Sequence, residues 1–196
     1  MKLSLLCGFF ALAATAFAGV VSFPECPAVG IDTSGCELLI TVTAVNGSGA
    51  ATVFNVAASS PDLGPFDTAD DTLIGILNSS SGVLDSITLT STVDIFGFDG
   101  DGACAAAFAP IAGCAGATDP SGYAPVGVTF SGINVPQTSG TVNFSPGIAV
   151  AGSNWFSLEE PLTVNSFTGA PEPGSVMLLG GGLAAVLGLA RRRRRG

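Results

Sequence analysis

Histidine is absent from the sequence, and lysine and arginine occur only near its two ends. The six basic residues are Lys2 and Arg191–Arg195, so residues 19–190 contain no cationic side chain. The absence of histidine excludes serine–histidine catalysis, cysteine–histidine catalysis and ordinary zinc sites. Nucleic-acid binding is excluded because it needs cations to replace phosphate counterions. The carboxylates between Glu25 and Glu172 must be solvated, hydrogen-bonded or bound to cations.

Long apolar runs are also missing from the middle of the chain, and the first of the two terminal runs is typical of a secretory signal peptide. Met1 and Lys2 form a short positive region, residues 3–14 are apolar, and residues 16–18 read Ala-Phe-Ala. This small-x-small triplet predicts cleavage between Ala18 and Gly19. We therefore expect residues 1–18 to be removed during export.

The C-terminal run combines a short polar motif, an apolar span and a basic end. Pro171, Glu172 and Pro173 come first, residues 175–190 carry no charge, and five arginines follow. As a helix the span covers roughly 24 Å, against a hydrocarbon core of about 30 Å. We expect a marginal transmembrane helix whose arginines stay on the cytoplasmic side. The two prolines keep the motif extended on the outer side, where a protease can reach it.

These three parts, in this order, resemble the PEP-CTERM sorting domain. The resemblance implies cleavage at Pro171–Pro173 by an exosortase-like membrane protease, after transient membrane insertion through the C-terminal span. It also implies delivery to the cell surface or extracellular matrix of an exopolysaccharide-producing bacterium, with exopolysaccharide as a partner of the delivered protein. A tail-anchored protein that is never cut is the alternative. The domain division that follows is residues 1–18, 19–168 and 169–196.

Four cysteines remain once Cys7 leaves with the signal peptide: Cys26, Cys36, Cys104 and Cys114. An exported domain lies in a compartment that permits disulfides, and four cysteines allow three pairings. The short intervals favour Cys26–Cys36 and Cys104–Cys114. Free buried thiols are the alternative.

Between the terminal segments, short apolar runs alternate with Gly, Ser, Asn, Asp and Pro, which is an all-β pattern. Turn residues at 46–49 predict a hairpin between the first two strands. We expect one β-sandwich domain over residues 19–168, jelly-roll-like in topology. The predicted strands are Leu38–Val45, Ala51–Ala57, Thr72–Leu77, Ser86–Thr92, Val126–Ile133, Gly140–Phe144, Asn154–Leu158 and Leu162–Phe167.

One acidic loop is a candidate metal site. Asp99 and Asp101 alternate with glycines, and Asp94, Asp70 and Asp71 are outside contributors. Calcium takes six to eight oxygen ligands, and such a loop can turn carboxylates and carbonyls inward. The twelfth position from Asp99 is a proline rather than a glutamate, so this is no EF-hand. The alternative is a glycine-rich turn whose aspartates cap backbone amides.

The sequence predicts a structural or adhesive exported protein without catalytic activity, and two other functions stay open. The first is calcium-dependent carbohydrate binding, in which Trp155 and Tyr123 would stack on sugar rings. The second is glycoside hydrolysis by carboxylates alone, in which Glu159 or Glu160 would work with Asp99 or Asp101. Neighbouring glutamates on a strand point to opposite faces, so both cannot line one cleft.

Overall fold

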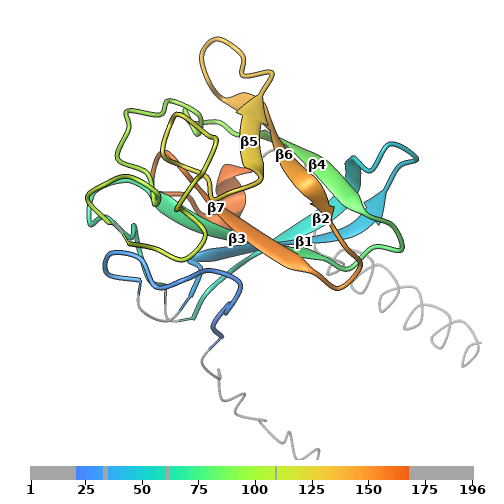
Figure 1. Cartoon of the computed structure of the whole chain (residues 1–196), viewed down its shortest axis with the longest axis horizontal. Coiled ribbons are helices and arrows are strands. Elements are labelled where there is room, and N and C mark those ends of the chain that lie inside the picture. The colour runs from blue at the N-terminus through green and yellow to red at the C-terminus, as the bar shows by residue number, and fades with distance from the viewer. Residues whose placement is uncertain (1–20, 33–34, 61, 109, 168–196) are drawn as a thin grey trace, which may run out of the picture.

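The computed structural model describes residues 21–32, 35–60, 62–108 and 110–167. The predicted signal peptide and sorting motif, including the Ala18–Gly19 bond, lie outside these residues. Among the described residues no helix is both long and apolar enough to cross a membrane. The regular elements of the described residues are strands apart from one 3₁₀ helix, which confirms the all-β prediction (Figure 1). Its elements are β1 (Leu38–Val45), β2 (Ala51–Ala58), β3 (Thr72–Asn78), β4 (Leu84–Thr90), β5 (Val128–Ser131), β6 (Ser139–Ile148), β7 (Ser153–Leu158) and the 3₁₀ helix η1 (Val164–Ser166).

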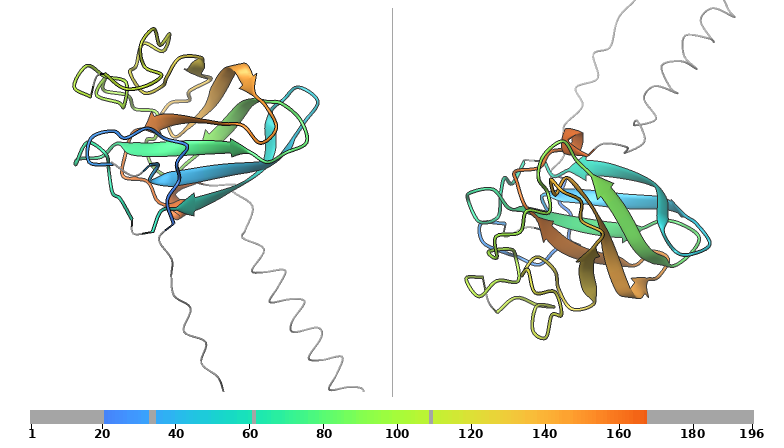
Figure 2. Two further views of the ribbon diagram at one scale, coloured as in Figure 1. Left: turned by 60° about the horizontal axis from the view of Figure 1, so that its bottom comes forward. Right: turned by 90° about the horizontal axis from the view of Figure 1, so that it is seen from above.

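The strands form two sheets, one ordered β2-β1-β3-β7 and the other β4-β6-β5 (Figure 2). β1 and β3 run parallel, and every other pairing between named strands is antiparallel. The expected two-sheet architecture is therefore present, but the order and the parallel pair differ from the antiparallel eight-stranded jelly roll. Parallel pairing of β1 with β3 requires the chain to return to the starting end of β1, and the antiparallel strand β2 provides this return before the chain continues to β3.

The predicted eighth strand, Leu162–Phe167, is not a strand. Its middle is η1, and only Phe167 pairs with a neighbour, in an isolated bridge to Ser91. Thr163 N–H donates to Ser166 Oγ, and Ser166 N–H donates to the Thr163 carbonyl. Local hydrogen bonds of this kind compete with a sheet ladder. Leu162 and Phe167 are nevertheless buried in the core, as their apolar character requires.

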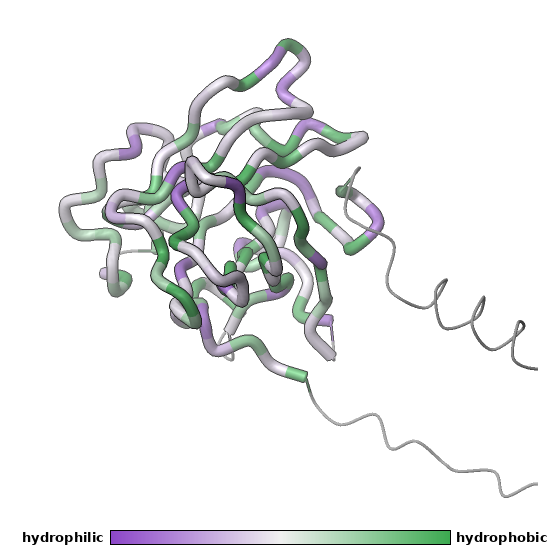
Figure 3. The backbone as a smooth tube through the Cα atoms, turned by 90° about the vertical axis from the view of Figure 1, so that its right-hand side faces the viewer, coloured by the Kyte–Doolittle hydropathy of each residue, from purple (hydrophilic) through white to green (hydrophobic). Residues whose placement is uncertain are grey.

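The central strand β3 of the larger sheet and parts of β1 and β7 are buried on both faces, whereas the edge strand β2 is exposed or half-buried. In β1, β3 and β7, alternate side chains enter either the core between the two sheets or a second apolar cluster on the outer face. Hydrophobic and hydrophilic residues alternate in short stretches along the chain (Figure 3). The inward set includes Leu38, Ile40, Val42, Ile74, Ile76, Phe156 and Leu158, and the outward set includes Leu39, Leu73 and Trp155.

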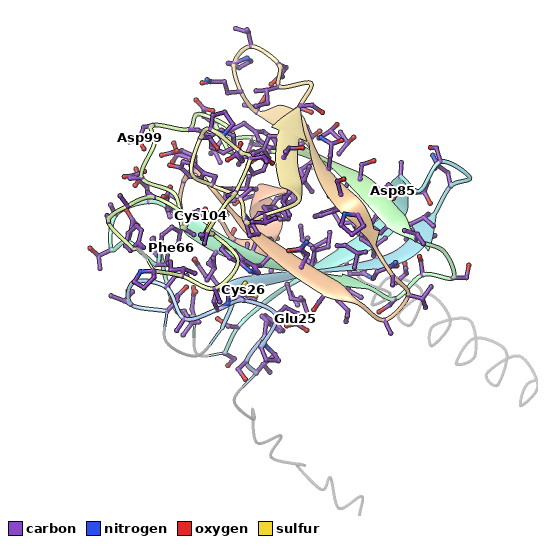
Figure 4. All side chains as sticks on the ribbon, viewed as in Figure 1. Glu25, Cys26, Phe66, Asp85, Asp99 and Cys104 are labelled. Atoms are coloured by element: carbon purple, nitrogen blue, oxygen red, sulfur yellow. A yellow bond between two sulfur atoms is a disulfide. The ribbon has the colours of Figure 1, made fainter. Side chains whose placement is uncertain are left out.

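The outer cluster is covered by the N-terminal segment and by the connection between β4 and β5. Both predicted disulfides form there, Cys26–Cys36 and Cys104–Cys114. Cys26 and Cys36 belong to the buried part of this cluster, and Cys104 and Cys114 pack against it. Cys26–Cys36 joins the N-terminal segment to the residue pair before β1, and Cys104–Cys114 closes a loop within the β4–β5 connection. Figure 4 places Cys104 and Asp99 at the loop-rich end of the molecule, opposite Asp85.

The predicted hairpin at residues 46–49 is also confirmed. Asn46 Oδ1 accepts from the backbone amides of Ser48 and Ala50, which closes the turn between β1 and β2. The Gly49 carbonyl in the same turn accepts from the Asp85 amide, at the start of β4. This bond ties the two sheets together along one side of the sandwich.

Candidate functional site

The candidate site lies at one edge of the larger sheet, where β3 begins and β7 ends. The antiparallel register pairs Thr72 with Leu158. Asp71 immediately precedes Thr72 and Glu159 immediately follows Leu158, so strand pairing brings these two carboxylates to one place. Thr72 Oγ1 also donates to the Glu160 carbonyl at 2.8 Å and accepts from the Leu162 amide at 2.8 Å. These bonds fix the chain on both sides of Glu159.

The loop after β4 brings two more carboxylates to this edge. Phe98 packs on the ring of Tyr123, and its two neighbours along the loop are Gly97 and Asp99. After Asp101, the Ala103 amide donates to Ser157 Oγ on β7 at 3.1 Å, and the Cys104 amide donates to the Gly122 carbonyl at 2.8 Å. The acidic turn is therefore held at both ends by packing and hydrogen bonds.

Tyr123 is the centre of the site, and it is completely buried. Its carbonyl accepts from the Ser157 amide at 2.8 Å, which attaches it to the free edge of β7. Its amide donates to Asp119 Oδ2 at 3.2 Å. A Cβ at Gly102 would lie 2.5 Å from the Tyr123 ring, so the ring can take this position only over a glycine.

Four carboxylate oxygens surround the hydroxyl of Tyr123. They belong to Asp71 at 3.2 Å, Asp99 at 3.2 Å, Asp101 at 2.8 Å and Glu159 at 2.7 Å. A phenol has one hydrogen to donate. At most one of the four carboxylates can therefore receive it, and the negative charge of the others must be compensated in some other way.

This crowding shifts the pKa values of the group. Burial, followed by the charges of Glu159 and Asp101, raises the pKa of Asp71 to about 8. Burial also raises the pKa of Glu159. Burial, followed by hydrogen bonds to Glu159 and Asp101, raises the pKa of Tyr123, so the phenol stays protonated. A hydrogen bond between Asp99 and Asp101 lowers the pKa of Asp99 and raises that of Asp101.

The carboxylates are close enough together to share a metal ion. In each of three overlapping groups, the ligand atoms lie within 4.8 Å of one another. With Ca–O distances of about 2.3–2.6 Å, one calcium ion spans oxygens up to roughly 5 Å apart. The three groups are Asp99, Asp101 and Glu159; Asp70, Asp71 and Glu159; and Asp67, Asp71 and Asp101.

The structure gathers most of the acids singled out in the sequence. Asp99 and Asp101 come together, and Asp70 and Asp71 join them, whereas Asp94 belongs to none of the three groups. The Asp94 carboxyl instead folds over its own turn, where a Cβ on Gly97 would lie 2.9 Å from it.

The two glutamates separate as expected for neighbouring residues. Glu159 enters two of the groups and Glu160 enters none. Trp155 is 8% exposed and Tyr123 is fully buried, so neither ring is available to stack on a sugar. The sequence had pointed to Tyr123 only as an aromatic surface, and its hydroxyl at the centre of the carboxylates was missed. No local sequence pattern predicts the contacts of this hydroxyl, because its acidic partners are 22–52 residues away in the sequence.

A second set of buried acids belongs to the segment that precedes β1. Asp32 is fully buried, and neither of its carboxyl oxygens has a hydrogen-bond partner in the structure. Glu37 is 3% exposed, and its Oε2 also lacks a partner. Burial first, and neighbouring acids second, raise the pKa of Asp32 to about 6 and that of Glu37 to about 8. These two residues belong to none of the three groups of potential ligands.

Comparison with known proteins adds evidence for the C-terminal segment, outside the described residues. Residues 170–195 match the family described as the PEP-CTERM protein-sorting motif. The chain carries a PEP-CTERM sorting motif. The resemblance inferred from Pro171, Glu172, Pro173 and the arginine tail is thereby confirmed. PEP-CTERM motifs support export, membrane anchoring through the C-terminus, and processing by an exosortase. No curated protein and no solved structure matches the chain.

Proposed function

We propose that this PEP-CTERM protein is a structural or adhesive component of the cell surface or extracellular matrix, without catalytic activity of its own. The sorting motif at residues 170–195 carries the proposal. An exosortase-like protease cuts the chain at Pro171–Pro173, after a signal peptidase has cut between Ala18 and Gly19. The delivered domain, residues 19–168, then associates with exopolysaccharide.

Three features of the delivered domain support a structural role. It contains no histidine, lysine or arginine, which removes the usual nucleophile activators and phosphate-binding groups. Strands β1, β3 and β7 of its larger sheet contribute side chains to two apolar clusters, one on each face of the sheet. Two disulfides fasten the loops that cover the outer face, as suits a protein that works outside the cell.

Intact mass spectrometry of the protein from its native host tests the sorting step. The expected mass is that of a chain from Gly19 to near Pro173, less two hydrogens for each disulfide, and reduction should restore those hydrogens. The same protein from a host without exosortase, or with Pro171→Ala and Pro173→Ala, should retain residues 176–196. Retention of those residues in the unmodified host would refute processing.

Fractionation of the producing culture tests the structural role. The wild-type protein should be found with the extracellular matrix, and loss of the protein should weaken matrix cohesion without changing the composition of the polysaccharide. The protein with both prolines replaced should stay with the membrane fraction. A wild-type protein found only in the membrane or the periplasm would contradict the proposed location.

Glycoside hydrolysis is a second candidate, favoured by one observation. Asp99 and Glu159 come together, and their pKa values are shifted in opposite directions. Such a split lets one carboxylate act as a base or nucleophile and the other as an acid. The test is release of reducing ends from the producer's own polysaccharide. Hydrolysis should disappear in both Asp99→Asn and Glu159→Gln, and the absence of any release by the wild-type protein would eliminate this candidate.

A further inference from the structure

The carboxylates around Tyr123 have no cationic side chain to balance them. Residues 19–190 contain no lysine, arginine or histidine, so no ion pair between side chains of the domain can balance them. Four carboxylate oxygens nevertheless lie within 3.2 Å of one hydroxyl oxygen. Burying charge without a partner is costly, so the group needs either protons or a bound cation.

Asp71 is the buried member of the group, and its carboxyl has an unused oxygen. It is fully buried, its Oδ1 lies at the Tyr123 hydroxyl, and its Oδ2 has no hydrogen-bond partner in the structure. Its neighbour Asp67 differs, because Asp67 Oδ1 accepts from the amides of Ala69, Asp70 and Asp71 at 3.0–3.2 Å. Asp67 therefore caps the backbone amides of a turn. Asp71 instead directs Oδ1 to the Tyr123 hydroxyl, and its Oδ2 has no hydrogen-bond partner.

The chemistry of the donors selects the kind of ion. Every side-chain donor in the group is an oxygen, and cysteine and histidine are absent from it. Hard divalent cations prefer such ligands. Calcium tolerates irregular sets of six to eight oxygens, whereas magnesium demands near-ideal octahedral geometry and shorter bonds. Asp99 is exposed, so an ion can enter from solvent and keep water as its remaining ligands.

We propose that Asp99, Asp101 and Glu159 bind one calcium ion beside the Tyr123 hydroxyl, with Asp71 as the inner carboxylate. The ion joins the loop after β4 to the end of β7 and to the residue before β3. Calcium binding therefore fastens the loop-rich end of the sandwich to its larger sheet. This site is independent of sorting, because none of its residues lies in the C-terminal motif.

Calcium titration of the full exported protein, purified from its host and stripped with EDTA, tests the proposal. Isothermal titration should give one ion per chain, with a dissociation constant on the order of 10⁻⁴–10⁻³ M, as for other extracellular calcium modules. Calcium at about 100 times that constant should raise the melting temperature by roughly 5–10 °C. Terbium(III), which replaces calcium in oxygen sites, should luminesce on excitation of Tyr123, the only tyrosine in the chain.

Two glutamine substitutions at neighbouring positions provide a matched pair. Glu159→Gln should lower calcium affinity at least about tenfold, because it removes one anionic ligand. In EDTA the same variant should melt at a higher temperature than the wild type, because it relieves repulsion among the carboxylates. Glu160→Gln changes a carboxylate outside the group and should leave both quantities unchanged.

Three results would overturn the proposal. One is the absence of binding heat, melting shift and terbium luminescence in the wild-type protein at about 10 mM calcium, a concentration above the weakest extracellular sites. Another is equal loss of affinity in Glu159→Gln and Glu160→Gln, which would indicate nonspecific screening. The third is undiminished affinity in Glu159→Gln and Asp99→Asn, which would place the ion elsewhere.

Discussion

The rings of Phe98 and Tyr123 pack against each other with their centroids 4.4 Å apart and their planes tilted by 33°. Phe98 also contacts Phe96 and Phe130, so it links the acidic loop to the core between the sheets. It is the side chain that anchors Asp99 and Asp101 beside the Tyr123 hydroxyl. The Phe98 ring contacts hold the loop on the side before Asp99, and the hydrogen bonds of Ala103 and Cys104 hold it on the side after Asp101.

Phe98→Ala should lower the free energy of unfolding by about 2–3 kcal/mol, below the usual range for a fully buried phenylalanine because Phe98 is only partly buried. It should also weaken calcium binding, since the loop loses its anchor. Urea unfolding and calcium titration of one preparation measure both effects. Val135→Ala, at a side chain 97% exposed, is the control and should change neither. A Phe98→Ala protein with wild-type stability would contradict the anchoring role.

Gly102→Ala should displace the Tyr123 ring. The added Cβ would lie 2.5 Å from the ring and 2.8 Å from the Gly122 carbonyl oxygen, and the backbone oxygen cannot move away easily. We expect a loss of about 1–3 kcal/mol in the free energy of unfolding, as is usual for overpacking. Near-ultraviolet circular dichroism of the single tyrosine should change as well. Gly47→Ala, where a Cβ meets no atom within 4 Å, should keep the wild-type spectrum and stability.

Much of the fold could be predicted because its signals are local. Leu38–Val45 was predicted with both its ends correct, and six other strands were placed within a few residues of their ends. The Asn46 turn and both disulfides also follow from short-range pattern and spacing. The prediction of a strand at Leu162–Phe167 was wrong because of local hydrogen bonds. Its apolar residues are buried as predicted, but Thr163 and Ser166 bond to each other and close a turn.

The site could be predicted only in part because it depends on the pairing register between β3 and β7. Asp99 and Asp101 attract attention as neighbours in a glycine-rich loop. The meeting of Asp71 with Glu159 requires that β3 and β7 pair, and that Thr72 lies opposite Leu158. A shift of one residue would turn these side chains to the other face. Nothing in the local sequence encodes that pairing, and the parallel arrangement of β1 and β3 is hidden for the same reason.

The two disulfides form a matched pair for separating stability from function. Each joins cysteines ten residues apart, so removal of either should cost a similar amount, about 2–4 kcal/mol, through the entropy of the unfolded chain. Only Cys104–Cys114 fastens the loop that carries Asp101. Replacing both of its cysteines with alanine should weaken calcium binding, whereas replacing Cys26 and Cys36 should not. Equal calcium affinities in the two double variants would contradict a role for Cys104–Cys114 in the site.

Two buried acids in the segment before β1, Asp32 and Glu37, make stability fall as the pH rises. Burial, with the charges of Asp32, Asp62 and Asp67, raises the pKa of Glu37 from 4.5 to about 8. The folded protein therefore binds this proton more tightly than the unfolded chain does between these two pH values. Stability should be highest near pH 4–5 and should fall as the pH rises toward 8. Asp32, whose pKa rises from 3.8 to about 6, contributes in the lower part of the same window.

Glu37→Gln should remove part of this dependence, because the amide stays neutral at every pH. We expect the variant to match the wild type within a fraction of a kcal/mol near pH 4.5 and to be more stable by roughly 1–3 kcal/mol at pH 8. Urea unfolding from pH 4.5 to 8.5 in EDTA measures the difference without any contribution from bound metal. Glu160→Gln should keep the wild-type profile. Parallel profiles for the wild type and Glu37→Gln would mean that the Glu37 carboxyl is charged in the folded protein, and that a cation or solvent must then reach it.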